Sequence, residues 1–438
     1  MPGRCAREID TRPMLEAHHI SLRHLRYGLA IAALGSISGA ARRLSRTQTA
    51  ITKALAELER QLDVPLFERL PQGMRVTRHG AILLRRAEAA AQALTPHPSG
   101  ERRVRADGLP TSIASLLDPR HPMILGNIKL THFLAVMARQ NSQAAADDLA
   151  IGAAAVRKSL REIEAVLDER LFERTAEGTL SPTRFARWLE QRCRLAFAEI
   201  GIALDEMRSQ RGVIQGQVNI GSVPFVRTAV LPRALARFAQ AHPQIRLSTR
   251  EATYADLELA LLTGQIDFIV GPLLQAPARR GLAARALMPA PVGLVVRRGH
   301  PLLARGPLRA ADLRSLTWIL PPPGSPSRTA LEQVMSRHRI HPGRHCIETS
   351  SYAVRRGLLL ETDFIAASPL VEFHHERTDG SVISLRPSFL SAGDWRRLVN
   401  PSSIVIRERS VMSPAATLCL AQIDEVAREF SGADAADH

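Results

Sequence analysis

Four neighbouring polar side chains have the chemistry needed to read a DNA sequence. They are Gln48, Thr49, Thr52 and Lys53. Glutamine can pair with an adenine edge, threonine offers a hydroxyl and a methyl group to thymine, and lysine can reach guanine or a phosphate. Apolar residues at helical intervals, Ile51, Leu55, Leu58 and Leu62, define the opposite face. With Thr47 as the N-cap, this pattern predicts a recognition helix for the major groove.

The segments on either side of this helix are predicted to position it. Leu22, Leu25 and Leu29 form the apolar face of a helix that ends at Gly35. Ser36 can cap a short second helix, and a hairpin wing is expected around Gly73, with arginines that contact phosphate or stay solvated. The residues expected to contact DNA are Ser36, Arg42, Arg43, Thr47, Gln48, Thr49, Thr52, Lys53, Arg69, Arg75 and Arg78.

This unit is repeated in the sequence. The stretch LSRTQTAITKALAELERQLDVPLFER, ending at Arg69, returns as LAIGAAAVRKSLREIEAVLDERLFER, ending at Arg174. Such self-similarity predicts the same supersecondary unit twice, here a helix, a tight turn and a second helix. The second unit is expected to be a few residues shorter before its paired alanines. Its apolar skeleton is Leu130, Phe133, Leu134, Val136, Met137, Leu149, Val156, Leu160, Ile163 and Leu167.

The two units differ in the side chains that would face DNA. The second unit has Ala153, Ala154, Arg157 and Asp147-Asp148 where the first has Gln48, Thr49, Thr52 and Arg42-Arg43. Net charge falls from about +6 over residues 21–80 to about +1 over residues 128–189. Alanine cannot hydrogen-bond a base and carboxylates repel phosphate, so we expect the second unit to have lost most sequence readout. It then serves as a spacer, a dimer contact or an auxiliary DNA contact through Arg157, Lys158 and Arg161. The competing interpretation is that each chain contains two modules that both read the DNA sequence.

Residues 22–94 resemble the winged helix-turn-helix of LysR-type transcriptional regulators. The matching motifs are Gly35-Ser36, Ala40-Ala41, Thr47-Gln48-Thr49-Ala50-Ile51, Leu58-Glu59, Leu66-Phe67-Glu68-Arg69 and Thr77 to Gly80. Thr49 stands where the family usually has proline, and the first turn of a helix tolerates either residue. The resemblance implies a sequence-specific regulator that binds double-stranded DNA.

Composition agrees with a nucleic-acid partner. The 438 residues carry a formal net charge of +16, and 45% of them are hydrophobic, which allows several domains with real cores. The four cysteines, Cys5, Cys193, Cys346 and Cys419, show no paired spacing and favour a reducing compartment. No apolar run approaches the roughly 20 residues of a membrane span, and residues 1–19 lack a secretory signal pattern. We therefore expect a cytoplasmic protein without a membrane partner.

Two connecting segments differ in composition from the modules. Residues 95–127, with Arg102, Arg103 and Arg105, are rich in proline, glycine and arginine and are expected to form an exposed linker. Residues 183–211 predict one long amphipathic helix. Its apolar stripe is Phe185, Trp188, Leu189, Cys193, Phe197, Ile200, Leu204 and Met207. The stripe either packs on its own domain or, as the resemblance favours, belongs to a linker helix through which a homodimer or homotetramer forms.

Residues 212–438 alternate short apolar strands with helices, as parallel βαβ units do. Residues 231–232, 238, 242–243, 264–267 and 300–302 resemble the effector-binding region of the same family, which implies two lobes like those of periplasmic binding proteins. We place lobe I at about 212–295 and 404–438 and lobe II at about 296–403. Ligands of such sheets bind beyond the carboxyl ends of the strands, where helix N-termini and hydroxyls suit anionic or sugar oxygens.

The expected effector-binding residues follow these strand ends. They are Ser222, Val223, Pro224, Pro272, Pro321, Ser327, Thr349 and Ser350. Ordinary N-capping is the alternative role for the hydroxyl-bearing residues among them. The resemblance points to sugars and organic acids as effector classes. Motifs of enzymes and cofactor sites are missing, and His374-His375 and the group His341, His345 and Cys346 are interpreted as exposed residues rather than zinc ligands.

Together these patterns predict a mixed fold and a regulatory function. Two mainly α winged helix-turn-helix modules, at 20–94 and 128–182, precede the long helix and a two-lobed α/β effector domain at 212–438. The expected function is DNA-binding transcriptional regulation under control of a small molecule, without enzymatic activity or a cofactor. The alternative is a cytoplasmic small-molecule-binding or enzymatic α/β protein whose helical modules mediate assembly.

Overall fold

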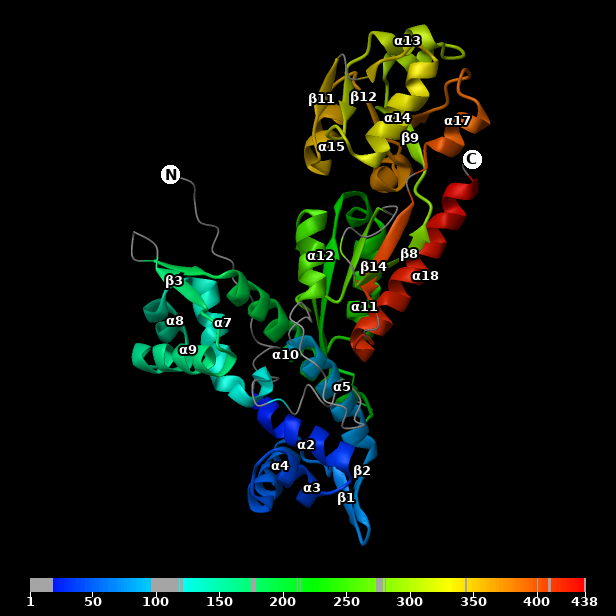
Figure 1. The fold of residues 1–438 in the computed structure, drawn as a ribbon. Helices are drawn as coiled ribbons and strands as arrows, with labels where there is room; N and C mark the ends of the chain where they lie inside the picture. The colour runs from blue at the N-terminus through cyan, green and yellow to red at the C-terminus, as the bar shows by residue number, and fades with distance from the viewer. Residues whose placement is uncertain are drawn as a thin grey trace. The chain divides into compact units, whose positions relative to one another are not determined.

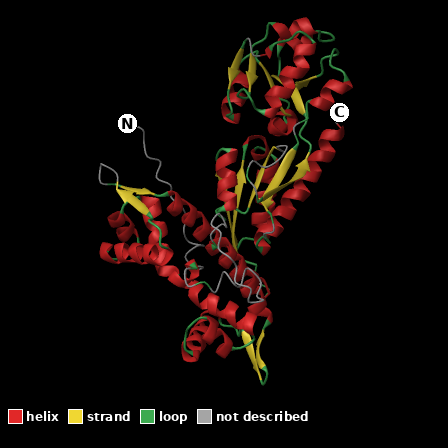
Figure 2. Ribbon diagram, viewed as in Figure 1, coloured by secondary structure: helices red, strands yellow, loops and turns green. Residues whose placement is uncertain are grey.

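The chain folds into two compact units. The computed structural model describes residues 19–95, 118, 121–174, 179–210, 212, 214–272, 279, 281–342, 345–399, 401–408 and 411–436. One unit comprises Met1–Gly216 with Thr263–Gln265, and the other comprises Gln217–Leu262 with Ile266–His438. The first is mainly helical and the second contains two five-stranded sheets (Figure 2). Within the described ranges, no helix combines the length and apolarity needed to cross a membrane.

The first module has the predicted order of elements. It consists of α2 (Leu22–Leu34), α3 (Ile37–Arg43), α4 (Gln48–Leu62), β1 (Phe67–Leu70), β2 (Gly73–Val76) and α5 (Arg78–Leu94). The predicted N-caps are confirmed, because the side chain of Ser36 accepts a hydrogen bond from the Gly39 amide and that of Thr47 from the Ala50 amide. These local bonds start α3 and α4 at the residues that the turn chemistry indicated.

Two tertiary contacts fix the hairpin β1–β2 to the helices. The Met74 amide donates to the Gly35 carbonyl at 2.9 Å, and a Cβ on Gly73 would lie 2.5 Å from the same oxygen. Gly73 also has φ of 137°, which a residue with a side chain rarely adopts. On the other side, Glu59 Oε1 accepts from the amides of Leu66 (2.7 Å) and Phe67 (3.2 Å). The hairpin is therefore held against both α2 and α4.

The second module repeats this arrangement. It consists of α7 (Asn127–Arg139), α8 (Ser142–Asp148), α9 (Ala153–Leu167), β3 (Phe172–Arg174) and β4 (Leu180–Pro182), and α10 (Arg184–Gln210) follows it. Helices α7, α8 and α9 have 13, 7 and 15 residues, the same lengths as α2, α3 and α4. Ala145-Ala146 are buried like Ala40-Ala41 at the corresponding positions. The expectation of a shorter second unit before these alanines is therefore wrong.

The segment expected as an exposed linker is partly buried. Arg102, Arg103 and Arg105 lie outside the described residues. At the end of the segment, η1 (Pro122–Leu125) is a 3-10 turn in which Met123 is 0% and Leu125 2% exposed. The sequence pattern did not reveal this turn because its apolar residues are too few to show a periodicity.

The second unit contains the two predicted α/β lobes (Figure 1). The sheet of lobe I has the order β6-β5-β7-β14-β8, and that of lobe II has the order β11-β10-β12-β9-β13. Pairs β5–β7, β10–β11 and β10–β12 are parallel, as the alternation of strands and helices predicted. The strands are β5 (Gly216–Ser222), β6 (Ile245–Glu251), β7 (Phe268–Pro272), β8 (Leu282–Met288), β9 (Val292–Arg297), β10 (Trp318–Leu320), β11 (Cys346–Glu348), β12 (Ile365–Pro369), β13 (Val382–Leu385) and β14 (Ser402–Arg407).

The boundary between the lobes differs from the expected one. Strand β9 pairs antiparallel with β12 and β13, so lobe II begins before Val292 and not at residue 296. Strand β14 returns to lobe I as predicted, between β7 and β8. Helices α11 (Val230–Ala241), α12 (Tyr254–Leu262) and α18 (Pro414–Ala436) belong to lobe I, and α13 (Ala310–Arg314), α14 (Pro326–Arg337), α15 (Tyr352–Glu361), α16 (His374–Thr378) and α17 (Ala392–Arg397) belong to lobe II. This unit also contains the short 3-10 turns η2 (Pro224–Arg227), η3 (Pro301–Ala304) and η5 (Leu370–Phe373).

His121 anchors the start of the second module to the end of α5. Its Nδ1 accepts from the Met123 amide at 3.2 Å, so the proton is on Nε2, which donates to the Ala91 carbonyl at 3.2 Å. The side chain is 3% exposed. Burial lowers the pKa of His121 to about 4, because the charged ring would lose its hydration.

This buried imidazole predicts a loss of stability in acid. Between pH 6.5 and 4 the unfolded chain binds a proton that the folded chain does not, so the free energy of unfolding falls as pH falls, by about 3 kcal/mol over the window. His121→Gln, whose amide cannot titrate, should flatten this dependence. Hydrogen exchange in peptides from α5 and α7, followed from pH 7 to 4 in both proteins, checks it. An equally steep profile in the variant contradicts the assignment.

Candidate DNA interface and effector site

The predicted reading residues lie on the exposed face of α4. Gln48, Thr49 and Lys53 are exposed and Thr52 is half-buried, with Thr47 exposed at the N-cap. The opposite face packs into the core through Ile51, Ala54, Leu55 and Leu58. Amide, hydroxyl and ammonium groups are thus presented together on one side of a helix whose other side is fixed, which is the arrangement that base readout needs.

The cationic residues around α4 have unequal surroundings. Arg42 and Arg43 are exposed in the last turn of α3. Arg69, Arg75 and Arg78 are exposed on the hairpin and at the start of α5, but Arg75 Nε donates to Glu68 Oε2 at 3.0 Å. The charge of Arg75 is therefore shared with a neighbouring carboxylate. Ser36 is half-buried, and its hydroxyl already accepts from the Gly39 amide at 3.1 Å.

The corresponding face of α9 is cationic but has no amide or hydroxyl. Ala154, Arg157, Lys158 and Arg161 are exposed there and Ala153 is half-buried. Lys158 lies 4.0 Å from Glu162, whose other oxygen is 2.6 Å from Lys129 Nζ. Such a surface can contact phosphates but offers no side-chain hydrogen bonds that distinguish bases, apart from those of arginine and lysine.

The two carboxylates at the end of α8 repel phosphate less than their types predict. Asp148 accepts from Arg139 Nε at 2.5 Å and from Arg139 Nη2 at 2.8 Å. Asp147 accepts from the Gln143 side chain at 2.9 Å. The predicted repulsion of phosphate stays a prediction, and the charge of Asp148 is partly balanced by Arg139 on α7, a partner that was not apparent from the sequence.

The apolar stripe of the long helix is covered within the chain. Leu189, Cys193, Phe197 and Ile200 are 0–1% exposed on α10, which packs against α5. The stripe therefore packs on the first module of the same chain, which neither alternative specified, and these residues are not available to a second copy. Burial raises the pKa of the Cys193 thiol, which favours a structural role over a redox role.

The predicted effector residues of lobe I lie at the ends of parallel strands. Ser222 ends β5 and is 1% exposed, and its Oγ has no hydrogen-bond partner among the described residues. Val223 is buried and Pro224 begins η2. Pro272 ends β7 next to the antiparallel β14, whose Ser403 hydroxyl donates to the Pro272 carbonyl at 3.2 Å. Ser222 therefore caps no helix through its side chain.

The predicted residues of lobe II lie at one edge of its sheet, because β10 and β11 run parallel. Pro321 follows β10, and Thr349 follows β11 with its hydroxyl accepting from the Ser351 amide at 3.1 Å. Ser351 caps α15, so the N-capping alternative is wrong for the exposed Ser350. It is also wrong for Ser327, which lies inside α14 after the N-cap position at Ser325.

Sequence reasoning missed a buried polar cluster at the same edge. Arg355 on α15 donates from Nη1 to Ser368 Oγ (2.8 Å) and to Glu372 Oε2 (2.5 Å), and all three residues are at most 3% exposed. Glu372 lies on η5, and η5 contacts η2, the turn that follows Ser222 in lobe I. The cluster thus includes a residue of η5, the turn through which lobe II contacts lobe I. The partners are 13 and 17 residues apart, so no short motif marks them.

Metal ligation is not supported by the described side chains, where no three histidine, cysteine or acidic residues gather. His374 is half-buried, not exposed as expected, because its ring packs on Phe430 with the ring centroids 4.7 Å apart. His341 and His345 are exposed and Cys346 is half-buried.

Two family models match most of the chain. "LysR substrate binding domain" matches residues 211–428, and "Bacterial regulatory helix-turn-helix protein, lysR family" matches residues 22–81 and 129–187. The chain is similar to the HTH-type transcriptional regulator GalR of Pseudomonas putida, at 30% identity over 95% of this chain and 100% of the relative. It is also similar to the HTH-type transcriptional regulator GbpR of Azospirillum brasilense, at 27% identity over 56% of this chain and 73% of the relative. A structure of full-length CbnR with its target DNA shares 19% identity over 69% of this chain and 98% of that chain, with a TM-score of 0.48.

The unpartnered hydroxyl of Ser222 predicts an unusual response to substitution. Ser222→Ala removes a buried polar group that makes no bond, so the melting temperature should stay unchanged or rise. Ser403→Ala is the matched control, because it deletes a buried hydroxyl that does donate and should cost about 1 kcal/mol. Thermal unfolding of both variants checks this. Equal destabilisation by the two substitutions contradicts a hydroxyl reserved for a ligand.

Proposed function

Because the chain belongs to the LysR family of transcriptional regulators, with a DNA-binding helix-turn-helix and an effector-binding domain, we propose that α4 reads the operator and that the strand ends of the two lobes bind the effector. The observation that carries the first part is the exposed set Gln48, Thr49 and Lys53 on a helix whose other face is buried. We assign residues 20–94 to the operator-reading domain and residues 212–438 to effector binding.

The roles proposed around α4 follow from chemistry. Gln48 and Thr49 contact base edges, and Lys53 contacts guanine or phosphate. Arg42, Arg43, Arg69 and Arg78 contact the backbone and set the register of the helix in the groove, because phosphate contacts position a reader without specifying a sequence. Arg75 contributes less, since Glu68 shares its charge.

The effector proposed for the lobes is a small polar molecule, a sugar or an organic acid. Ser222 supports this assignment because its buried hydroxyl has no partner among the described side chains, and Thr349 and Ser350 add hydroxyls at the edge of lobe II. Effector binding there changes how the lobes meet at η2 and η5 and thereby the placement of the readers. We further propose that the protein is a homo-oligomer without enzymatic activity that works in the cytoplasm, where its DNA is; the names of its relatives support a regulatory role.

The reading role of α4 is tested by a double substitution. Gln48→Ala with Lys53→Ala should lower affinity for the promoter region of the protein's own gene at least tenfold, because each lost base contact is worth about 1–3 kcal/mol. The salt dependence should also become shallower by about one phosphate contact. Fluorescence anisotropy at several salt concentrations measures both.

The control removes one amide and one cation from exposed positions of lobe II, Gln333→Ala with Arg396→Ala. This variant should bind like the parent. Equal binding by the α4 variant and the parent would show that α4 is not the reader.

A further inference from the structure

We infer that one chain carries both halves of a two-fold-related DNA-binding unit and binds a non-palindromic duplex site, in which α4 reads bases and α9 contacts phosphates. The inference rests on the proposed role of α4. It adds that the second half of the unit is supplied by the same chain and not by another copy.

The repeat relates the two modules position by position. Each helix of the second module begins 105 residues after its counterpart, as Leu22 and Asn127 or Gln48 and Ala153 show. The hairpin contains one more residue in the second module, so the offset grows by one after it. The N-cap of α5 is Thr77, whose hydroxyl accepts from the Gly80 amide, and the corresponding residue before α10 is Thr183, whose hydroxyl accepts from the Ala186 amide. Positions in α5 therefore correspond to positions 106 residues later in α10.

Equivalent residues touch each other at the start of the two modules. The Leu22 amide donates to Asn127 Oδ1 at 2.8 Å, and these residues occupy the same position in α2 and α7. Asn127 Nδ2 donates in turn to the Ile20 carbonyl, and Asn127 is 7% exposed. In an interface related by a two-fold axis, a residue meets its own counterpart only beside the axis. The pseudo-axis of the unit thus passes near Leu22 and Asn127.

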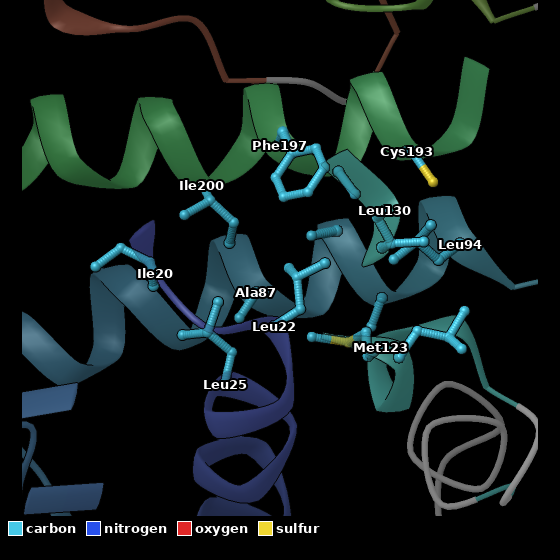
Figure 3. Close-up of a cluster of buried hydrophobic side chains, with 14 of the residues drawn as sticks. Ile20, Leu22, Leu25, Ala87, Leu94, Met123, Leu130, Cys193, Phe197 and Ile200 are labelled. Carbon is cyan, nitrogen blue, oxygen red and sulfur yellow. The ribbon is translucent and has the colours of Figure 1, made fainter. Parts of the chain in front are cut away.

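Helices α5 and α10 pack around the same pseudo-axis. In Figure 3, Leu94 lies at the end of the pair that holds Cys193, and Ala87 lies at the end that holds Ile200, so the helices are antiparallel. In the repeat, Leu94 corresponds to Ile200 and Ala87 to Cys193, so the repeat exchanges the two ends of the helix pair. Buried residues stand at corresponding positions of the two helices along the seam. These corresponding positions are Leu83 and Leu189, Ala87 and Cys193, Ala90 and Ala196, and Leu94 and Ile200.

A buried ion pair makes the α5–α10 seam specific for two different helices. Arg86 Nη1 donates to Glu199 Oε2 at 2.9 Å, and Arg86 also donates to Glu206; the Arg86 and Glu199 side chains are 4% and 7% exposed. The position of α5 that corresponds to Glu199 is Ala93. Two α5 helices from different copies would therefore bury Arg86 without this carboxylate, which costs several kcal/mol per charge.

The chain returns to α5 where the second module begins. His121 Nε2 lies 3.5 Å from Thr95 Oγ1, although the two residues are 26 positions apart. Arg23 Nε donates to the Ile124 carbonyl at 3.2 Å, and Arg26 Nη2 donates to the Asp118 carbonyl at 3.2 Å. The start of the second module is thus bonded to the first module, which favours pairing of the two within one chain.

The halves of this unit are alike in fold and unequal in chemistry. The face of α4 carries Gln48, Thr49 and Lys53, whereas the face of α9 carries Arg157, Lys158 and Arg161 beside alanines. A two-fold pair of readers matches the symmetry of duplex DNA, but only one of these readers offers an amide and hydroxyls to bases. The preferred site is therefore one specific half-site beside a stretch whose sequence matters little.

Cross-linking across the seam tests the internal pairing without DNA. In a Cys5→Ser, Cys346→Ser background of the full chain, Leu94→Cys is expected to form a disulfide with native Cys193 that leaves the protein monomeric on a non-reducing gel. Ala87→Cys with Ile200→Cys in the same background is the second variant, in case the first does not fold. Cross-linked dimers as the main product of both, at low protein concentration, would overturn the inference.

Selection of bound sequences from a random duplex library tests the unequal halves. The parent should select one non-palindromic motif for each chain bound. Arg157→Ala, Lys158→Ala and Arg161→Ala together should keep that motif, weaken binding to all sequences, and make the salt slope shallower by up to about three contacts. The control, Arg298→Ala, Arg314→Ala and Arg396→Ala in lobe II, should bind as the parent does.

The outcomes separate this inference from the proposed function. A palindromic motif, together with a triple α9 variant that binds like the parent, would overturn the inference while α4 remains the reader. If Gln48→Ala with Lys53→Ala binds DNA like the parent while the internal cross-links still form, the proposed role of α4 is overturned instead.

Discussion

The packing of α5 against α10 is the contact on which the DNA-binding unit depends. Its seam buries apolar residues from both helices around Arg86, whose charge is balanced by Glu199 and Glu206 of α10. Burying a guanidinium without its partners is costly, so the ion pair selects one helix pairing among several that the apolar seam alone would allow. The positions of both modules follow from that choice.

The two modules share one fold and differ in surface chemistry. Both keep the helix lengths, the buried alanine pair and the glutamate that binds the base of the hairpin, as Glu59 and Glu164 do. What has changed is the exposed face of the third helix, which is not needed for folding and is free to vary. A shared fold with a different surface is the physical basis for the proposed reader and the proposed backbone contact within one chain.

The second unit depends on a different kind of contact. Its two sheets meet near η2 and η5, where the buried cluster of Arg355, Ser368 and Glu372 lies within lobe II and Ser222 lies at the end of a strand in lobe I. Ser222 Oγ, Arg355 Nε and Glu372 Oε1 are all buried without a hydrogen-bond partner among the described residues, and such groups are the basis of the ligand site that we propose at the strand ends.

Local chemistry was predictable and distant pairing was not. The N-caps Ser36 and Thr47, the end of α2 at Gly35 and the parallel strands followed from short patterns, because each depends on residues close in the chain. The antiparallel place of β9, the pair of Arg139 with Asp148 and the bond of Arg86 to Glu199, 113 residues away, depend on tertiary contacts that no local pattern encodes. The helix α4 and its exposed face were predicted from periodicity, while the Arg355 cluster was missed.

The most direct test of the account is a distance measured within single chains. In the Cys5→Ser, Cys346→Ser background, spin labels at Lys53→Cys and Lys158→Cys occupy equivalent exposed positions on α4 and α9, and pulsed electron resonance reports their separation. Pairing of the two modules within one chain predicts one narrow distance that persists when labelled protein is diluted with excess unlabelled protein. A distance that disappears on dilution, or a distribution too broad to define one arrangement, would contradict it.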